Sequence, residues 1–580
     1  MADKSDSEKT VEAQTEAPEA ELSSTTEADA GSEAAPDSST EAAPDLGSEA
    51  APDSSTATAP EAAQPPTSEP VTAAVVEKEY PGSVSDTPTI EHPDGRVELR
   101  DESTIRSSKL YNPDLAPVPV AKRNWTTYNF AALWVSLSAC IPAYMLSSGL
   151  MGSGMNWWQA LLTILVGNLI VLMPILANSH PGTKYGIPFP VFARAAYGTI
   201  GSNLPALMRA LVACGWFGIQ CWIGGKAVFF LIDSVIPGWE TMLGPRVGGY
   251  FPSVWASFLF FWALNVFVIY RGMEQVKKVG AFAAPFVLLM CFLLVVWAVS
   301  SAHGFGPLMS VPSRYNNLAS FLPIFIPSLT AIIGFWATLS LNMPDFTRFG
   351  RSQREQLLGQ AFALPAAMTV LSATGVIVTS AAVVIYPTKH IQQLWDPIAL
   401  MGMFDNKFIV FIAMLTVAIA TLAMNIAANV VSPANDFSNA LPRLISFRTG
   451  GLITAFLGIA LQPWALMTDP SLYIFKWLVG YSGGLGSIAG VLVVDYWIIK
   501  KKKLNLQDLY LNQGAYRYVG GWNFAAVAAT LLGCAGAWGG LIIIEMRPLF
   551  DYGWFVGFFV AAVSYMLFMP TPKPEGHHGH

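Results

Sequence analysis

Residues 131–142 read AALWVSLSACIP, small apolar residues that end in a proline inside a longer apolar stretch, 127–152. A second stretch, 322–342, contains Pro327 and then GFWAT at 334–338. Each is near the ~20 apolar residues that a helix needs to cross a bilayer, yet carries helix-weakening residues at mid-span. Interruptions at corresponding places in two halves indicate an inverted-repeat transporter with a binding site at the breaks. The alternative is that Gly and Pro merely kink these helices.

Further apolar stretches surround these two. All must be helical, because backbone groups cannot remain unpaired in hydrocarbon. The expected fold class is an all-α membrane protein with 12 transmembrane helices, in which two inverted repeats of five spans are followed by two peripheral spans. Span one then corresponds to span six. The expected spans are 127–152, 157–178, 204–234, 252–271, 279–301, 322–342, 361–386, 407–432, 450–467, 472–499, 522–546 and 553–570.

The composition divides the chain of 580 residues into two parts. Residues 1–70 carry a net charge of −15, whereas the remainder carries +8. Only 13% of all residues are charged and 53% are apolar, which excludes a soluble enzyme. A basic stripe of the kind that duplex binding needs is also missing, so nucleic acid is not an expected partner.

The acidic part contains an eight-residue repeat that starts with EAAPD at residues 33, 41 and 49. Low hydrophobicity, high charge and frequent Pro predict a disordered tail over 1–100, either a solvated extension or a partner-binding segment. We expect a cytoplasmic pre-membrane segment at 101–126, a transporter domain at 127–570 and a cytoplasmic tail at 571–580.

Basic residues alternate between the loops as the positive-inside rule requires. With the N-terminus inside, the inner loops hold 15 Lys and Arg residues and the outer loops five. The inner ones are Lys184, Arg194, Arg271, Lys277, Lys278, Arg348, Arg351, Arg354, Arg443, Arg448, Lys500, Lys501, Lys502, Lys503 and Arg517, and the outer ones are Arg246, Arg314, Lys389, Lys407 and Arg547. Both termini are therefore expected in the cytoplasm, in a multi-pass protein of the cell membrane.

Aromatic and carboxamide side chains lie at mid-span in three of these stretches. Trp216 and Gln220 share one face of span three, Asn425 and Asn429 share one face of span eight, and Trp336 lies in span six. Two indoles can stack on a flat ring, and carboxamides match the edge of a purine, pyrimidine or hydantoin. An isolated amide in a membrane helix is more simply an interhelical contact, but the set converges on a heterocycle site.

Five motifs carry a resemblance to a known family: GWFGIQCW (215–222), GFWAT (334–338), NMPDFTR (342–348), NIAANVVSPAND (425–436) and YSGGLGSIAGVLVVDY (481–496). Residues 105–570 thereby resemble the nucleobase–cation symport family one, which includes hydantoin, allantoin and nucleobase permeases. The resemblance implies the leucine-transporter (LeuT) fold. It also implies substrate residues Trp216, Gln220, Phe335, Trp336 and Asn429.

The resemblance further implies a cation-site region at the span-one break and in span eight, formed by Ser136, Ala139, Ala420, Ala423 and Met424. The family's hydantoin carrier has two hydroxyl ligands there, and the matching residues, Ala423 and Met424, supply no oxygen, which hard cations prefer. A proton is therefore favoured over Na⁺ as the coupling cation. Lys226 in span three is a candidate proton carrier, or it extends to the nearby outer interface.

The sequence thus predicts a secondary transporter that imports a planar nitrogen heterocycle with H⁺ or Na⁺. It predicts no enzyme activity, no cofactor and no metal site, and the expected partners are a small heterocyclic substrate and the lipid bilayer, with the protein as a monomer. One alternative is a transporter of the same fold for another solute, such as an amino acid. Another, a membrane-embedded enzyme or channel, lacks the polar groups that it would need.

Overall fold

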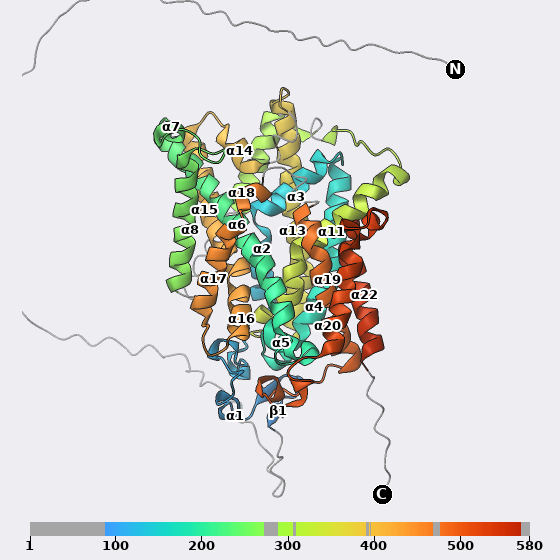
Figure 1. Cartoon of the computed structure of the whole chain (residues 1–580). Helices are drawn as coiled ribbons and strands as arrows, with labels where there is room; N and C mark the ends of the chain where they lie inside the picture. Colours follow the sequence, from blue (N-terminus) through green and yellow to red (C-terminus); the bar gives the residue numbers. More distant parts are fainter. Residues whose placement is uncertain are drawn as a thin grey trace, which may run out of the picture. The chain divides into compact units, whose positions relative to one another are not determined.

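The computed structural model describes residues 88–271, 288–305, 309–389, 394, 396–467 and 476–569. Most of the expected acidic tail, the C-terminal tail and the beginnings of the expected spans five and ten lie outside these residues. Residues 84–580 group into one compact unit, and the described part of it is mostly helical (Figure 1).

The described part of each expected span contains at least one apolar helix. The helices of the spans are α2 (Thr127–Ser138), α3 (Ile141–Gly152), α4 (Trp157–Tyr185), α6 (Asn203–Val235), α8 (Pro252–Arg271), an unlabelled helix Leu288–Ser301, α11 (Leu318–Asn342), α13 (Gln353–Ile385), α15 (Lys407–Asn429), α17 (Phe447–Ala460), α19 (Val479–Val493), α20 (Phe524–Trp538) and α22 (Gly553–Phe568). The shorter helices between them are α5 (Phe189–Tyr197), α7 (Trp239–Met242), α12 (Pro344–Thr347), α14 (Pro397–Gly402), α16 (Val431–Ala440), α18 (Pro463–Leu466) and α21 (Arg547–Asp551).

The count of 12 transmembrane helices is not established by helix length. In the described residues, eight helices are long and apolar enough to cross a membrane, and two bent pairs raise the number to 10. The two remaining spans, Leu288–Ser301 and α17, are shorter apolar helices. The all-α membrane class is confirmed.

The interruption expected in span one is present. α2 ends at Ser138 and α3 begins at Ile141, with a bend of 57° between them. Cys140 is extended (φ −139°, ψ 153°), and Pro142 lies in the first turn of α3, where proline needs no amide hydrogen. The proline therefore starts a new helix instead of continuing the old one.

The interruption expected in span six is wrong, because α11 is one continuous helix with Pro323 and Pro327 inside it. A proline removes one backbone donor, and neighbouring helices can supply the missing hydrogen bonds in a membrane protein. Near the middle of α11, Tyr481 Oη of α19 donates to the Gly334 carbonyl at 2.7 Å. Packing against α19 thus supports the glycine-containing part of this helix.

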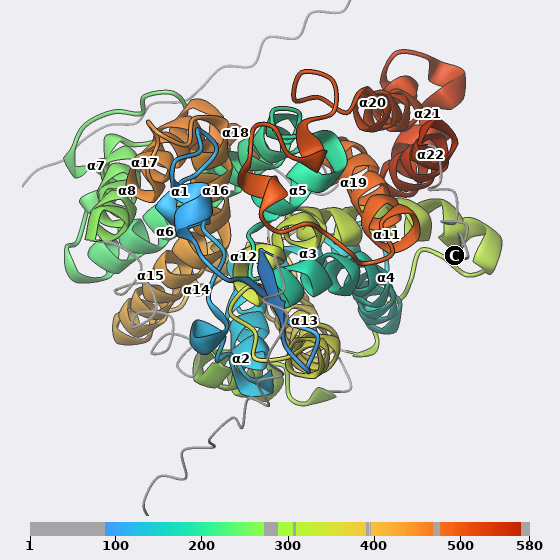
Figure 2. The ribbon, with the colours of Figure 1, turned by 90° about the horizontal axis from the view of Figure 1, so that it is seen from below.

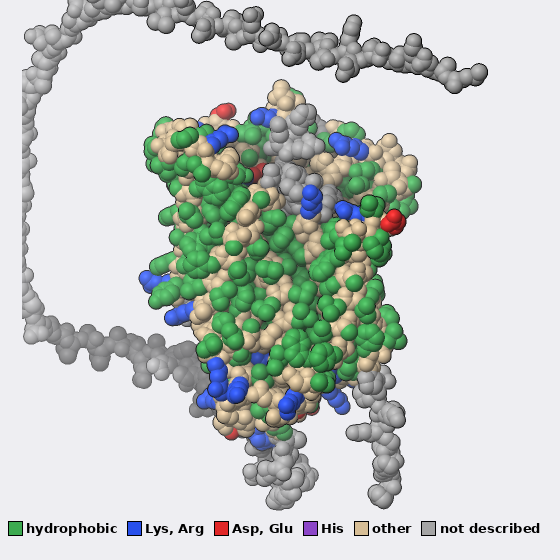
Figure 3. Space-filling model, viewed as in Figure 1, with side chains coloured by type: hydrophobic (Ala, Val, Ile, Leu, Met, Phe, Trp, Pro, Cys, Tyr) green, Lys and Arg blue, Asp and Glu red, His purple; other side chains and the backbone are tan. Residues whose placement is uncertain are grey.

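Three groups of helices lie side by side, as Figure 2 shows from one end. α6 packs with α8, α15, α16 and α17; α4 packs with α11, α12 and α13; and α19 packs with α20 and α22. α11 also contacts α19 and α6, and α13 contacts α2. The outer surface carries a band of hydrophobic side chains, whereas Lys and Arg gather toward the ends of the helices (Figure 3). Such a belt is suited to lipid.

The boundary of the acidic tail at residue 100 is wrong, because residues 88–100 contain a hairpin. Its strands are β1 (Thr89–Glu91) and β2 (Val97–Leu99), which lie with α1 (Ser103–Arg106) at one end of the helices (Figure 1), called here the α1 end. Arg123 donates to the carbonyls of Val97 (2.9 Å), Val118 (2.8 Å) and Lys184 (3.1 Å). Burial lowers the pKa of this guanidinium to about 10. The hairpin is thereby fastened to the end of α4.

Candidate substrate site

Two of the expected substrate residues meet between α6 and α11. The rings of Trp216 and Phe335 are edge-to-face, with centroids 5.3 Å apart and an interplanar angle of 74°. Both side chains are buried, as is the adjacent Trp336. The structure therefore gathers aromatic rings from spans three and six in the interior of the protein.

Trp336 faces a different neighbour from Phe335, since successive residues on a helix point about 100° apart. Its indole Nε1 donates to Asn168 Oδ1 of α4 at 2.8 Å, and its ring lies edge-to-face on Trp134 of α2, 5.2 Å away. The rings of Phe335 and Trp336 are 4.8 Å apart. Phe335 is thus the ring that connects Trp216 with Trp336.

Tyr481 of α19 joins this cluster, a role for which the sequence carried no direct signal. Trp216 Nε1 donates to Tyr481 Oη at 3.1 Å, and the same hydroxyl donates to the Gly334 carbonyl. The bond orients the indole with its nitrogen toward α19. The tyrosine was included in the motif 481–496, but its partners on α6 and α11 depend on the fold.

Gln220 lies one turn from Trp216 on α6 and is fully buried. Its Nε2 contacts Met424 Sδ of α15 at 3.2 Å, a weak acceptor, and its Oε1 has no hydrogen-bond partner among the described residues. A buried polar atom without a partner costs about 1–3 kcal/mol. The carboxamide oxygen is therefore ready to accept a hydrogen bond from a ligand.

Asn429 ends α15 and is buried beside Asn425. Its Nδ2 donates to Asn425 Oδ1 at 3.0 Å, and Asn425 Nδ2 in turn lies 3.1 Å from Asn265 Oδ1 of α8. Asn425 also approaches the Phe217 carbonyl of α6 at 3.4 Å. Asn425 is thus an interhelical contact, and it holds the Asn429 carboxamide on α15.

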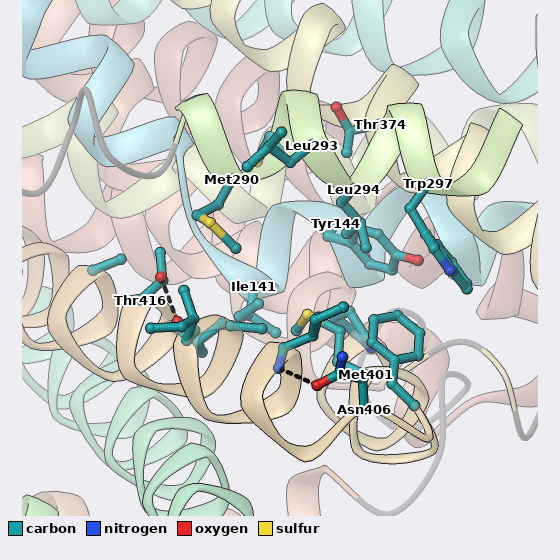
Figure 4. A pocket seen from close by; sticks show the side chains of 18 of the residues that line it. Ile141, Tyr144, Met290, Leu293, Leu294, Trp297, Thr374, Met401, Asn406 and Thr416 are labelled. Atoms are coloured by element: carbon teal, nitrogen blue, oxygen red, sulfur yellow. Dashed lines mark hydrogen bonds between the residues drawn. The ribbon is translucent and has the colours of Figure 1, made fainter. Parts of the chain in front are cut away.

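The residues of the expected cation region lie in the last turn of α2, at the break after it and on α15. Ala139 and Ala420 line a cavity of about 690 Å³ between α3, helix Leu288–Ser301, α13, α14 and α15 (Figure 4). Ala423 is buried, Met424 contacts Gln220, and Ser136 is half-buried. Ser138, at the end of α2, has a buried hydroxyl without a partner.

Figure 4 shows Met290, Leu293 and Trp297 of helix Leu288–Ser301 on one wall of this cavity, with Met401 of α14 and Thr416 of α15 across from them. The lining is mainly apolar, and it includes none of the ring and carboxamide residues around Trp216. The cavity is therefore distinct from the aromatic cluster.

Lys226 lies toward the end of α6 that is farther from α1, and it forms an ion pair with Asp396. The two side chains are 25% and 13% exposed. Asp396 also caps α14, where its Oδ1 accepts from the Ile398 amide at 3.0 Å. The lysine is thus partly exposed and has a carboxylate counter-ion.

Sequence analysis did not predict a buried ion pair toward the α1 end. Arg209 of α6 and Asp436 of α16 are both 0% exposed, with Arg209 Nη1 3.2 Å from Asp436 Oδ2. Asp345 and Asp495 are also buried and do not face the surface; Asp495 pairs with Lys500 and accepts from Tyr565 Oη at 2.8 Å. Arg209 lies inside an expected span and is a usable signal, but its partner Asp436 is far away in sequence.

The described residues contain no group of three or more His, Cys, Asp or Glu side chains that could hold a metal ion. The arrangement of rings and carboxamides is instead suited to holding a small planar molecule through stacking and hydrogen bonds.

Comparison with known proteins gives consistent matches over most of the chain. A family model described as permeases for cytosine/purines, uracil, thiamine and allantoin matches residues 117–557. An allantoin permease of Bacillus subtilis is 40% identical over 475 residues, covering 82% of this chain and 96% of that protein. A purine-uracil permease of Arabidopsis thaliana is also 40% identical, covering 75% and 72%.

Among solved structures, Mhp1, a nucleobase-cation-symport-1 family transporter in a closed conformation with bromovinylhydantoin bound, matches with a TM-score of 0.64 at 22% identity. The match covers 79% of this chain and 96% of that chain. At this identity the likeness concerns the fold, and it confirms the fold expected from the resemblance.

Proposed function

Because the chain belongs to the family of permeases for cytosine/purines, uracil, thiamine and allantoin, and is therefore a transporter and not an enzyme, we propose that it imports a planar nitrogen heterocycle together with a proton. The candidate cargo is allantoin, hydantoin or a nucleobase. The protein acts in the cell membrane, as a monomer with both termini in the cytoplasm.

The observation that carries this proposal is the Gln220 Oε1 atom, which has no hydrogen-bond partner among the described residues and belongs to a side chain one turn from Trp216 on α6. Allantoin, hydantoin and the nucleobases that carry a carbonyl present ring or ureido N–H groups beside that carbonyl. Such an N–H satisfies the glutamine oxygen, while the ring stacks on the indole, a contact worth about 1–3 kcal/mol. A molecule without the N–H leaves the oxygen unpaired and binds much more weakly.

The other expected residues have supporting roles in this proposal. The Asn429 carboxamide forms hydrogen bonds with the opposite edge of the ring. Phe335 and Trp336 close the pocket on the α11 side. The absence of oxygen ligands on Ala423 and Met424 supports H⁺ over Na⁺ as the coupling cation. Transport follows by alternating access around this buried site.

Uptake of radiolabelled allantoin, uracil and hydantoin into cells that express the protein tests the proposal. We expect sodium replacement to leave uptake unchanged and a protonophore to abolish it. Unlabelled rings should compete, whereas N-methylated analogues that lack the matching N–H should compete at least about ten-fold more weakly. Uptake inhibited by an amino acid but by no heterocycle would reject the proposal.

Gln220→Leu provides the residue-level test, because it keeps the approximate volume and removes the acceptor. We expect this variant to lose discrimination between each ring and its N-methylated analogue. Gln462→Leu, in the turn before α18, is the matched control and should discriminate as the wild type does. Equal discrimination in Gln220→Leu and wild type would remove Gln220 from the site.

A further inference from the structure

The buried Arg209–Asp436 pair lies in line with the candidate substrate site on two helices. Arg209 precedes Trp216 by seven residues on α6, and Asp436 follows Asn429 by seven residues from α15 into α16. Seven residues are two helical turns, or about 10 Å, and return to the same face. The ion pair is therefore one layer below the site, toward the α1 end.

Asp345 adds a second buried carboxylate to this layer. It lies in α12, directly after α11, and is 1% exposed. Its Oδ1 accepts from the Phe189 amide of α5 at 3.0 Å, and its Oδ2 has no hydrogen-bond partner in the part of the chain that the structure describes. Ser432 of α16 is a further hydrogen-bonding neighbour, and it also contacts the Asn342 amide.

Few other charges face Asp345. Arg209 and Arg348 are within electrostatic reach of it, and Asp436 is its acidic neighbour. Arg348 is half-buried and donates to the Asp114 carbonyl at 3.0 Å, and Tyr510 also faces its guanidinium. Cys214 of α6 lies near Arg209 and Asp436. In the part of the chain that the structure describes, Asp345 has no ion pair within 4.0 Å.

The result is two buried carboxylates beside one fully buried guanidinium, which is already paired with Asp436. An uncompensated charge in such a place is costly, and neutralisation is the usual outcome. Burial raises the pKa of the Asp345 carboxyl above its ordinary value. Several polar atoms around the layer are buried without partners, namely Asp345 Oδ2, Asp436 Oδ1, Arg209 Nε and Nη2, Asn435 Oδ1 and Nδ2, and Asn342 Oδ1.

We propose that Asp345 is the group that takes up the coupling proton, beside the fixed Arg209–Asp436 ion pair. This inference rests on the proposed function. A proton from the outer solution reaches Asp345 through the unoccupied substrate site, forms the neutral acid, and leaves to the inner solution after the ring. The Arg209 guanidinium disfavours a metal cation in the same place.

Protonation of Asp345 also affects the contact between α12 and α16, which follow the helices that carry Phe335 and Asn429. Asp345 follows the helix that carries Phe335, and its neighbours Ser432 and Asp436 follow the helix that carries Asn429. A charged carboxylate between α12 and α16 has to keep its partners during transport, whereas a protonated one can separate from them at lower cost. Proton binding therefore permits the two helices to move with respect to each other.

The test uses the full-length protein in liposomes with two assays on Asp345→Asn, which mimics the protonated acid. Counterflow of a labelled heterocycle needs no proton gradient, and we expect it to stay near the wild-type rate. In the wild type, a gradient of about one pH unit can drive accumulation of the ring to about a ten-fold concentration ratio if one proton is carried per ring. We expect Asp345→Asn to lose this accumulation. Asp345→Glu should restore it in part, and Asp551→Asn on α21 is the control that should behave as wild type.

Accumulation by Asp345→Asn equal to that of wild type would overturn the inference. If this variant does not fold, the wild type still decides: adding the ring to weakly buffered, de-energised vesicles should make the outer medium more alkaline. No alkalinisation, with accumulation driven by sodium, overturns the inference and leaves the proposed function intact. A wild type that moves no heterocycle even in counterflow overturns both.

Discussion

The indole of Trp216 donates to Tyr481 Oη at 3.1 Å, and through that hydroxyl it is connected to the Gly334 carbonyl 2.7 Å further on. One oxygen atom thus joins α6, α11 and α19 beside the candidate substrate site. The tyrosine hydroxyl fixes the plane on which a ring would stack.

Tyr481→Phe should therefore weaken transport without abolishing it. A single neutral hydrogen bond contributes about 0.5–1.5 kcal/mol, which corresponds to a rise in KM of about two- to ten-fold. Initial uptake rates over a range of substrate concentrations measure this change. Tyr128→Phe, at a side chain that is 78% exposed, is the control, and an equal rise in both variants would contradict the prediction.

Trp216→Ala should abolish uptake, since it removes both the stacking surface and the hydrogen bond to Tyr481. Asn429→Ala should also abolish uptake, because it removes the carboxamide that we propose to hydrogen-bond to the edge of the ring. Trp158→Ala is the matched control because that indole on α4 is 47% exposed, and it should leave uptake near wild type. Normal transport by Trp216→Ala and Asn429→Ala at equal surface expression would remove both from the site.

Lys226→Met should retain protonophore-sensitive uptake, because the structure pairs this lysine with Asp396 in a partly exposed position. An ion pair of this kind is worth at most about 1 kcal/mol, so a modest loss of stability is expected. Asp396→Asn and the double variant complete a double-mutant cycle. We expect the double variant to lose less stability than the sum of the losses in the two single variants. Loss of proton dependence in Lys226→Met would instead assign proton coupling to the lysine.

Gly334→Ala should separate α11 from α19. A Cβ at this position would lie 2.6 Å from the Leu478 carbonyl oxygen, closer than such contacts occur, so one helix has to shift. We expect a lower melting temperature and reduced uptake. Gly480→Ala on α19 has no atom within 4 Å of its new Cβ and is the matched control. Unchanged stability in Gly334→Ala would contradict the prediction, because it would show that α11 and α19 can move apart without a loss of stability.

The helical class and the break in span one could be predicted because both depend on local sequence. A proline at 142 at the start of a helix is visible in the chain itself. The continuity of α11 could not be predicted in this way, because its support by Tyr481 comes from a helix about 150 residues away. The hairpin at β1 and β2 depends likewise on the Arg123 side chain.

The candidate site shows the same division. Trp216, Gln220 and Asn429 could be selected from their residue types and spacing within single helices. Which ring faces Trp216, and which groups neutralise Arg209 and Lys226, depends on pairs that are far apart in sequence. The surroundings of Asp345 depend likewise on the fold, because its neighbours lie on α5 and α16.

The bare carboxamide oxygen of Gln220 has a practical consequence for identifying the cargo. A compound that donates a hydrogen bond to this oxygen binds the folded protein and so raises its melting temperature. The melting temperature of the purified protein, measured with each candidate compound in turn, can therefore identify the cargo before any vesicle is prepared.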